Sequence, residues 1–259
     1  MKFDNLRLEE KIKKGINYIE NGNLHEAKII FEELKNNKQS ENAGLLFLGI
    51  IQIKKRNFTQ AKVFFNKILN NEPKNTDANL NMGLVFLEEK NNEKAIIFFD
   101  KVIKEDKNNL NAIYHKGLAN FLSKNYNDAI ISFEKCINLN KNHTPSYLTL
   151  GHSFLNVKNF KKSIENYLKV LELDPKNNNA KFNLAWSYFA IMELDKAFKY
   201  YEFRREKIKS NAKIIEIKEK FKANEWLGED LNNKKIIILS EQGIGDNIQF
   251  FRYLFLIKK

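Results

Sequence analysis

The chain has almost no cysteine and little proline: its 259 residues include one Cys, Cys136, and three Pro. One cysteine excludes an internal disulfide and fits a reducing compartment. No apolar run comes near the ~20 residues that span a bilayer. The first residues, Met1–Gly15, are charged throughout and lack the apolar stretch of a signal peptide. We therefore expect a cytoplasmic protein with no membrane span.

Histidine and charge give no sign of catalysis. The histidines show no metal-ligand spacing and are assigned no chemistry; they are His25, His115, His143 and His152. The formal net charge of +12 allows nucleic acid or an acidic partner. Lysine is scattered along the whole chain, without the compact basic run that grips phosphates, so the sequence does not favour nucleic acid.

The chain does contain a repeat with a period of 34 residues. One register holds small residues: Gly15, Gly49, Gly83, Gly117, Gly151 and Ala185. A second register also holds small residues: Ala27, Ala61, Ala95, Ala129, Ser163 and Ala197. Each member of the second register is followed four residues later by an aromatic residue: Phe31, Phe65, Phe99, Phe133, Tyr167 and Tyr201. The period is typical of an all-α solenoid built from helix–turn–helix units.

Each unit is predicted to be a pair of helices, because its apolar residues recur at helical spacing. A third register, between the two helices, holds Asn23, Asn57, Asn91, Asn125 and Asn159. Asparagine tolerates the left-handed conformation that closes a helix, so we expect it there. Thr59, Asn127 and Asp195 are expected to cap the second helix. The small residues are predicted where the two helices cross with their backbones close together.

In these registers the chain resembles the tetratricopeptide repeat family from about Leu8 to Asn211. A small residue stands at repeat positions 8 and 20 and an aromatic residue at position 24, whereas the proline of position 32 survives only as Pro73 and Pro175. The resemblance implies a right-handed superhelix of about six helical hairpins. It also implies a concave groove, lined by the first helices, that binds a peptide or protein partner.

Asn81 and Asn183 are the predicted peptide-groove residues. Each stands two residues before the small residue of position 8. In the repeats of O-linked N-acetylglucosamine transferases, asparagines at this position grip a peptide backbone. An amide side chain can both donate and accept hydrogen bonds, which suits that role. A solvated surface residue is the alternative, because the equivalent positions hold Lys13, Phe47, His115 and Thr149.

The composition changes after the repeats of residues 1–211. Residues 212–234 are predicted to form a capping helix, Ala212 to Asn224, and a linker. Residues 235–259 then predict a strand, a glycine turn and a helix, which is the first half of an α/β unit. The turn, with Gly243 and Gly245, could bind a phosphate or substrate at the start of its helix. It matches neither a dinucleotide fingerprint nor a P-loop.

The block Glu241-Gln242-Gly243-Ile244-Gly245-Asp246, followed by Arg252-Tyr253, resembles the start of a glycosyltransferase-like domain similar to heptosyltransferases. The resemblance implies that Asp246 is a general base on the acceptor side. The alternative is that Asp246 only caps the following helix. A nucleotide-sugar donor would need a second lobe that these residues do not supply. We therefore expect no cofactor here and no complete enzyme.

Three hypotheses follow. The first is a scaffold that binds a protein or peptide partner in the groove and carries an incomplete glycosyltransferase lobe. The second is a fragment of an enzyme that transfers sugar to an acceptor presented by the repeats. The third is an RNA-binding solenoid, which strongly salt-dependent binding would support.

Overall fold

The computed structural model describes residues 2–201 together with Phe203 and Lys220. The described residues form twelve α-helices and no strand. The chain divides into two compact units, Met1–Lys176 and Asn177–Lys259, which are described separately. The predicted boundary at residue 211, the linker of residues 212–234 apart from Lys220, and the β–α segment of residues 235–259 lie outside the described residues.

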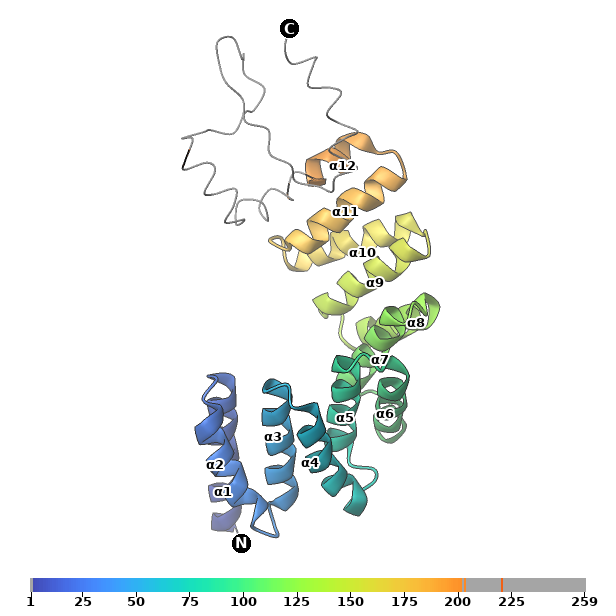
Figure 1. The fold of residues 1–259 in the computed structure, drawn as a ribbon. Coiled ribbons are helices and arrows are strands. Elements are labelled where there is room, and N and C mark those ends of the chain that lie inside the picture. Colours follow the sequence, from blue (N-terminus) through green and yellow to red (C-terminus); the bar gives the residue numbers. More distant parts are fainter. Residues whose placement is uncertain (1, 202, 204–219, 221–259) are drawn as a thin grey trace. The chain divides into compact units, whose positions relative to one another are not determined.

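The first unit is a stack of five helical hairpins (Figure 1). We call the first helix of each hairpin its A helix: α1 (Lys2–Glu20), α3 (Glu41–Lys54), α5 (Thr76–Glu88), α7 (Leu110–Leu122) and α9 (Thr144–Asn156). The second is its B helix: α2 (Leu24–Lys35), α4 (Phe58–Asn71), α6 (Asn92–Glu105), α8 (Tyr126–Leu139) and α10 (Phe160–Leu173). Each A helix after α1 packs against its own B helix and the preceding one.

The second unit contains one further described hairpin, formed by α11 (Asn178–Ala190) and α12 (Leu194–Tyr201), which pack against each other. The six hairpins follow the 34-residue period. The prediction of an all-α array of helical hairpins is therefore confirmed for the described residues.

The two registers of small residues surround an aromatic ring inside each hairpin. The position-20 residues have no exposed surface, and neither do the position-24 rings from Phe31 to Tyr167. A Cβ added to Gly83 would lie 2.5 Å from Cε1 of Phe99, and one added to Gly49 would lie 2.3 Å from Cε1 of Phe65. The glycine is therefore needed because an aromatic ring covers it. This refines the prediction, which placed backbone against backbone there.

Backbones do approach closely at Gly44, between two hairpins. A Cβ on this residue of α3 would lie 2.3 Å from the backbone nitrogen of Lys35 and 2.7 Å from the carbonyl oxygen of Phe31, both in α2. Unlike the end of a side chain, a backbone cannot rotate away. Glycine at this position therefore sets the approach of the second hairpin to the first.

The turn between the two helices differs from the sequence-based prediction. The left-handed residue is the one before the asparagine register: Gly22, Arg56, Lys90, Lys124, Lys158 and Met192, with φ between 57° and 77°. The asparagine follows the left-handed residue, and its backbone amide donates to a carbonyl oxygen near the end of the A helix. Asn91 N, for example, donates to Phe86 O at 2.8 Å. This is the bond pattern of a Schellman motif, whose left-handed residue comes one position earlier.

The asparagine side chain opens the B helix instead. Asn57, Asn91 and Asn159 accept a hydrogen bond from the backbone amide three residues later. The predicted caps Thr59 and Asn127 make no such bond in the structure. The prediction of a left-handed asparagine was wrong because asparagine suits both roles, and a single register cannot show which end of the turn it serves.

Lys90→Gly is expected to stabilise the protein by about 0.5–1 kcal/mol. Lys90 adopts φ 60°, a conformation that is sterically unfavourable for a residue with a Cβ atom but not for glycine. Urea unfolding followed by circular dichroism measures the change. Lys101→Gly is the control, because this exposed residue lies inside α6, where glycine should destabilise by about 1 kcal/mol. Equal destabilisation by both variants would contradict the prediction.

Candidate functional site

Each A helix of the first unit has three sides, and two of them are used in packing. Position 8 faces the hairpin's own B helix, as Gly83 faces Phe99. Positions 7 and 10 face the preceding B helix, since Met82 and Val85 of α5 share a core cluster with Ala61 and Phe65 of α4. Positions 5, 9 and 12 lie on the remaining third side, because a residue advances 100° around a helix.

The third side is apolar along the array. We call it the A-helix face and define it by positions 5, 9 and 12 of four helices: Leu46, Ile50 and Ile53; Leu80, Leu84 and Leu87; Tyr114, Leu118 and Phe121; Leu148, His152 and Leu155. All of these residues are partly exposed, and several of them, such as Leu80, Leu84 and Phe121, also pack with part of their surface against a core cluster of their hairpin. A surface helix usually turns its polar side to water, so apolar residues repeated on this side of successive helices mark a candidate interaction surface.

No charged residue belongs to the A-helix face. Burial lowers the pKa of His152, which is therefore neutral at neutral pH and lies edge-on to the ring of Tyr167, at 5.6 Å between centroids. Leu122, at position 13 beside the face, is 52% exposed and extends the apolar surface on α7. The face can therefore bury apolar groups, while Lys54 and Glu88, at position 13 of α3 and α5, place charges beside it.

The predicted groove residues Asn81 and Asn183 lie in different units. Each amide donates to the carbonyl oxygen four residues earlier in its own helix: Asn81 to Asp77 at 2.9 Å, and Asn183 to Asn179 at 2.7 Å. Both residues are partly exposed, so each amide keeps some surface open to other groups. That they grip a peptide stays a prediction.

The same register serves packing in other repeats. Phe47 stacks on Phe31 of the preceding hairpin at 4.6 Å, and His115 stacks on Phe99 at 5.9 Å. Position 6 therefore borders the preceding B helix and lies at the edge of the A-helix face. Burial lowers the pKa of His115, so its imidazole packs there as a neutral ring.

The sequence-based reasoning missed the apolar residues of the A-helix face. It attributed the apolar residues of each helix to the core and chose the polar position 6 for binding. The missing signal was the number of apolar residues, because the A helices carry partly exposed apolar residues at positions 5, 9 and 12 in addition to the buried ones at positions 7 and 10. Counting apolar residues on all three sides of the helix would have identified the face.

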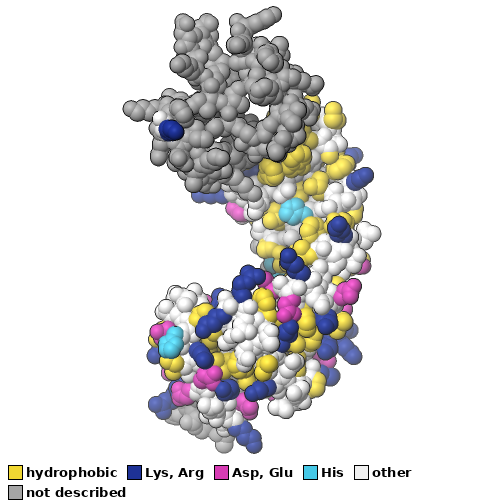
Figure 2. All heavy atoms as spheres, in the orientation of Figure 1, with side chains coloured by type: hydrophobic (Ala, Val, Ile, Leu, Met, Phe, Trp, Pro, Cys, Tyr) yellow, Lys and Arg dark blue, Asp and Glu magenta, His cyan; other side chains and the backbone are white. Residues whose placement is uncertain are grey.

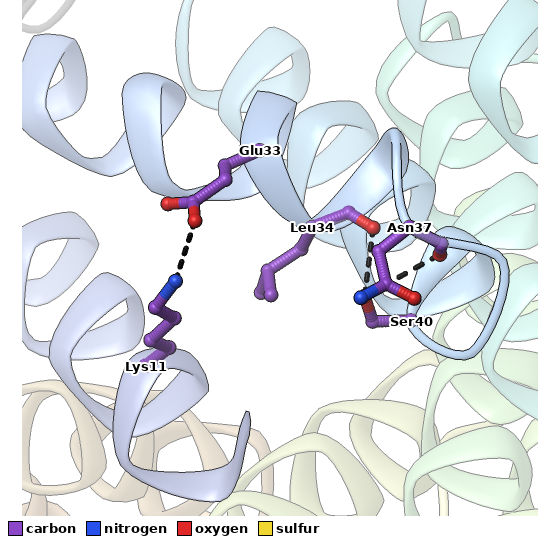
Figure 3. Close-up of polar contacts among 5 residues, drawn as sticks. All are labelled: Lys11, Glu33, Leu34, Asn37 and Ser40. Carbon is purple, nitrogen blue, oxygen red and sulfur yellow. Dashed lines mark hydrogen bonds and ion pairs between the residues drawn. The ribbon is translucent and has the colours of Figure 1, made fainter. Parts of the chain in front are cut away.

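A cavity lies at the start of the array, between residues of the first two helices and the loop that follows them. It is a cavity of about 400 Å³ whose lining includes Arg7, Leu8, Lys11, Glu33 and Asn37. Figure 3 shows Lys11 and Glu33 paired, at 2.5 Å, and the Ser40 hydroxyl bonded to the Leu34 carbonyl at 2.8 Å. The ion pair joins two of the three charged residues named in this lining, and Arg7 is the third.

Among the described residues, three other kinds of site were considered: a metal site, a membrane-spanning helix and a basic patch. No three His, Cys, Asp or Glu side chains gather there as metal ligands. Across the described helices, none has the length and apolar character needed to cross a bilayer. On the side drawn in Figure 2, the Lys and Arg side chains are spread over the surface and do not form one patch.

Two family models match the chain. Residues 148–202 match the tetratricopeptide repeat, and residues 88–170 match subunit 3 of the anaphase-promoting complex, or cyclosome. None of the curated proteins compared with the chain matches it. The two models together support a tetratricopeptide-type array over α6 to α12.

Solved structures show the same fold. A structure titled as the functional characterisation of Pseudomonas aeruginosa PilF is 17% identical with a TM-score of 0.70, over 82% of this chain and 96% of that one. A MamA crystal structure is 27% identical with a TM-score of 0.59, over 64% and 96%. A tetratricopeptide repeat protein from Parabacteroides merdae is 21% identical with a TM-score of 0.61, over 75% and 77%.

The predicted residues of the glycosyltransferase-like segment, Gly243, Gly245 and Asp246, lie outside the described residues. The family models match residues within 88–202 and do not reach them. The resemblance of this segment to a glycosyltransferase therefore stays a sequence-based prediction.

Proposed function

Taking the described hairpins as a tetratricopeptide-type repeat array, we propose that the protein is an interaction scaffold. Its A-helix face binds an apolar segment of a protein partner. The observation that supports this is the row of partly exposed apolar side chains at positions 5, 9 and 12, repeated on α3, α5, α7 and α9.

The chemistry of the face indicates the kind of partner. Aliphatic and aromatic side chains such as Ile50, Leu118 and Phe121 gain free energy by burying apolar surface. The face lacks charged members, so it does not select by ion pairs. A partner segment with one apolar side therefore fits better than a highly charged tail, and an amphipathic helix laid in a groove is a familiar example.

A double variant, Ile50→Glu/Leu118→Glu, is expected to abolish binding of peptides selected against the native chain. The probe is a phage-displayed library of random peptides panned on the full chain, and binding is measured by fluorescence anisotropy with the enriched peptides. Each glutamate places a charge where an apolar partner must be desolvated, which is costly. The enriched peptides should share apolar residues on one side.

Ile97→Glu/Ile131→Glu is the matched control. These residues lie on the B helices α6 and α8, are 56% and 65% exposed, and stand outside the A-helix face. The control should keep native peptide affinity and a native circular dichroism spectrum. Equal loss of binding in both variants, or enrichment of highly charged peptides insensitive to either, would refute the proposal.

The enzyme alternative rests on the block Glu241 to Asp246 and the Arg252-Tyr253 that follows it. In that alternative the repeats present an acceptor, Asp246 takes the acceptor's proton, and residues beyond this sequence bind the nucleotide-sugar. The coding sequence after the codon for Lys259 tests it: further strand–helix units would support it, and an immediate stop codon would count against it.

A further inference from the structure

Three of the four histidines lie on or beside the part of the A-helix face that α7 and α9 form. His152 is a member of the face, and His115 lies at its edge. His143 immediately precedes α9 and lies edge-on to Tyr114, a member of the face, at 5.2 Å between ring centroids. The fourth, His25, lies on α2 and is exposed. Histidine is the side chain whose charge normally changes between about pH 5 and 8, so this part of the face holds three groups able to respond to pH.

The ring of His115 is held where a second proton would lack a partner. It stacks on Phe99 at 5.9 Å, and its Nδ1 is buried with no hydrogen-bond partner among the described residues. A neutral imidazole can leave one nitrogen unprotonated, whereas the charged form donates from both nitrogens. Protonation in place would therefore create a buried, charged donor without an acceptor, which is costly.

His143 stands where two earlier A helices have a capping asparagine. Asn75 and Asn109, at the same repeat position, accept a hydrogen bond from the backbone amide three residues later, and His143 makes no such bond. Its Nδ1 lies 2.7 Å from the Ser146 hydroxyl instead. A charge on this ring would lie at the start of α9, where the helix macrodipole disfavours a cation.

His152 lies between two aromatic rings. It is edge-on to Tyr167 of α10, at 5.6 Å between centroids, and its ring lies 6.3 Å from that of Phe121 of α7. The same repeat position is Ile or Leu in α3, α5 and α7. A charged imidazole here would interrupt an apolar row.

Burial lowers the pKa of all three histidines, which are therefore neutral at neutral pH. The titratable side chains in contact with their rings are Tyr114 and Tyr167, and Cys136 lies close to Ser146, the partner of His143. Burial raises the pKa of all three of these side chains, so each stays uncharged between about pH 5 and 8.

Carboxylates are not placed to stabilise a charged imidazole. The helices α7 and α9 carry none, and those of the helices packed against them, α5, α6, α8 and α10, are all exposed. The basic side chains on these elements that contact other groups include Lys116, paired with Asp100 at 2.6 Å, Lys135, which donates to the Lys107 carbonyl oxygen at 2.7 Å, Lys141, which donates to Asn138 at 3.1 Å, and Lys162, 5.1 Å from the ring centroid of Phe154. Burial therefore opposes proton uptake by the histidines, and no buried carboxylate of these helices offsets it.

We propose, on the basis of the proposed function, that pH regulates partner binding at the α7 and α9 part of the A-helix face. This part binds an apolar partner while His115, His143 and His152 are neutral, and releases it when they are protonated. A bound partner removes further water from the rings, so binding opposes protonation and, by linkage, protonation opposes binding. A histidine whose pKa falls by one further unit on binding changes the affinity about tenfold at pH values below both pKa values.

Peptide binding to the full chain at about pH 7.5 and about pH 5 tests the proposal. The probes are peptides enriched by panning on the full chain that lose binding to Leu118→Glu, contain no Asp, Glu or His, and have blocked ends. Such probes bind at α7 and do not titrate themselves. Fluorescence anisotropy should show that the native chain binds them at least about tenfold more weakly at the lower pH.

The variant His115→Phe/His143→Asn/His152→Leu should lose the pH dependence. Each new residue already stands at the same repeat position elsewhere in the array, as Phe47, Asn75 and Leu84. The affinity of this variant should stay within about twofold of the native value at the higher pH and change by no more than about twofold at the lower. His25→Thr is the matched control, because Thr59 holds that position in the next repeat, and it should keep the native pH dependence.

Folding is checked at both pH values, because a histidine pKa lowered by burial also makes the fold less stable as pH falls through it. The native circular dichroism spectrum should persist at about pH 5, and its loss would overturn the proposal, since release would then be unfolding. Equal native affinity at the two pH values, or a pH dependence that survives in the triple variant, would overturn the regulation alone. If panning yields no peptide that loses binding to Leu118→Glu, the proposed function fails and the regulation fails with it.

Discussion

Phe99→Ala is expected to lower the free energy of unfolding by about 3–5 kcal/mol, which is a large part of the stability of a small domain. The Phe99 ring has no exposed surface and lies between Gly83 of its own hairpin and His115 of the next. Removing the ring leaves a void bounded by two rigid helices, which can collapse only in part. Urea unfolding followed by circular dichroism measures the loss.

Ile97→Ala is the control for Phe99→Ala, because Ile97 lies two residues away on the same helix and is 56% exposed. A surface substitution of this kind should change stability by no more than about 0.5 kcal/mol. A loss below about 1 kcal/mol for Phe99→Ala, or similar losses for both variants, would show that the ring is not an essential part of the hairpin core.

Gly83→Leu is the second large effect, and we expect it to destabilise the protein by about 1–3 kcal/mol or more. Even the Cβ of the new residue would lie 2.5 Å from Cε1 of Phe99, too close without movement of the ring. The ring is enclosed, so its movement disturbs the hairpin and its neighbour. The same urea titration measures this loss.

The double variant Gly83→Leu/Phe99→Ala tests whether the Phe99 ring is what excludes a larger residue at position 83. If the ring is what excludes a larger residue, its removal should make room for leucine, and the double variant should be more stable than the sum of the two losses predicts. Coupling of this sign is expected for residues in direct contact. Additive losses would mean that Gly83 is required for another reason.

Sequence alone predicted the hairpins because the 34-residue period repeats a packing requirement. The glycine of position 8, the alanine of position 20 and the ring of position 24 form a single contact unit, and each member limits the size of the others. Gly151 and Tyr167 show that the unit tolerates a hydroxyl group: a Cβ on this glycine would still lie 2.6 Å from the ring, as in the hairpins built on phenylalanine. Because this packing limits the size of the side chain at each of the three positions, it leaves a repeated pattern of small and aromatic residues that can be recognised in the sequence.

The turn could not be predicted as well, because its geometry constrains the backbone and hardly constrains the side chain. Arg56, Lys90, Lys124, Lys158 and Met192 all adopt positive φ where glycine would be expected, and only Gly22 matches that expectation. The hydrogen bonds on both sides of the turn hold these residues in place. The side chains of lysine and methionine give no sign of a left-handed conformation. Asparagine is known to adopt it, so the prediction placed it at the neighbouring asparagine.

The candidate site was harder to predict than the core for a similar reason. Binding was expected at Asn81 and Asn183 because an amide suits a peptide backbone. The structure instead draws attention to apolar residues such as Ile50 and Leu118, which a sequence alone cannot separate from core residues. Only the structure shows that these residues keep part of their surface exposed, whereas the apolar residues of positions 7 and 10 are buried.

The placement of Phe99 over Gly83 has a consequence for how such a chain can change in length during evolution. Every glycine–ring contact is made within one hairpin, and the other packing contacts join immediate neighbours. Duplicating or deleting a complete unit of 34 residues therefore joins surfaces that already match, whereas an insertion inside a helix, between a glycine and its ring, moves the two out of register. Evolutionary changes in the length of the repeat array should therefore add or remove whole hairpins.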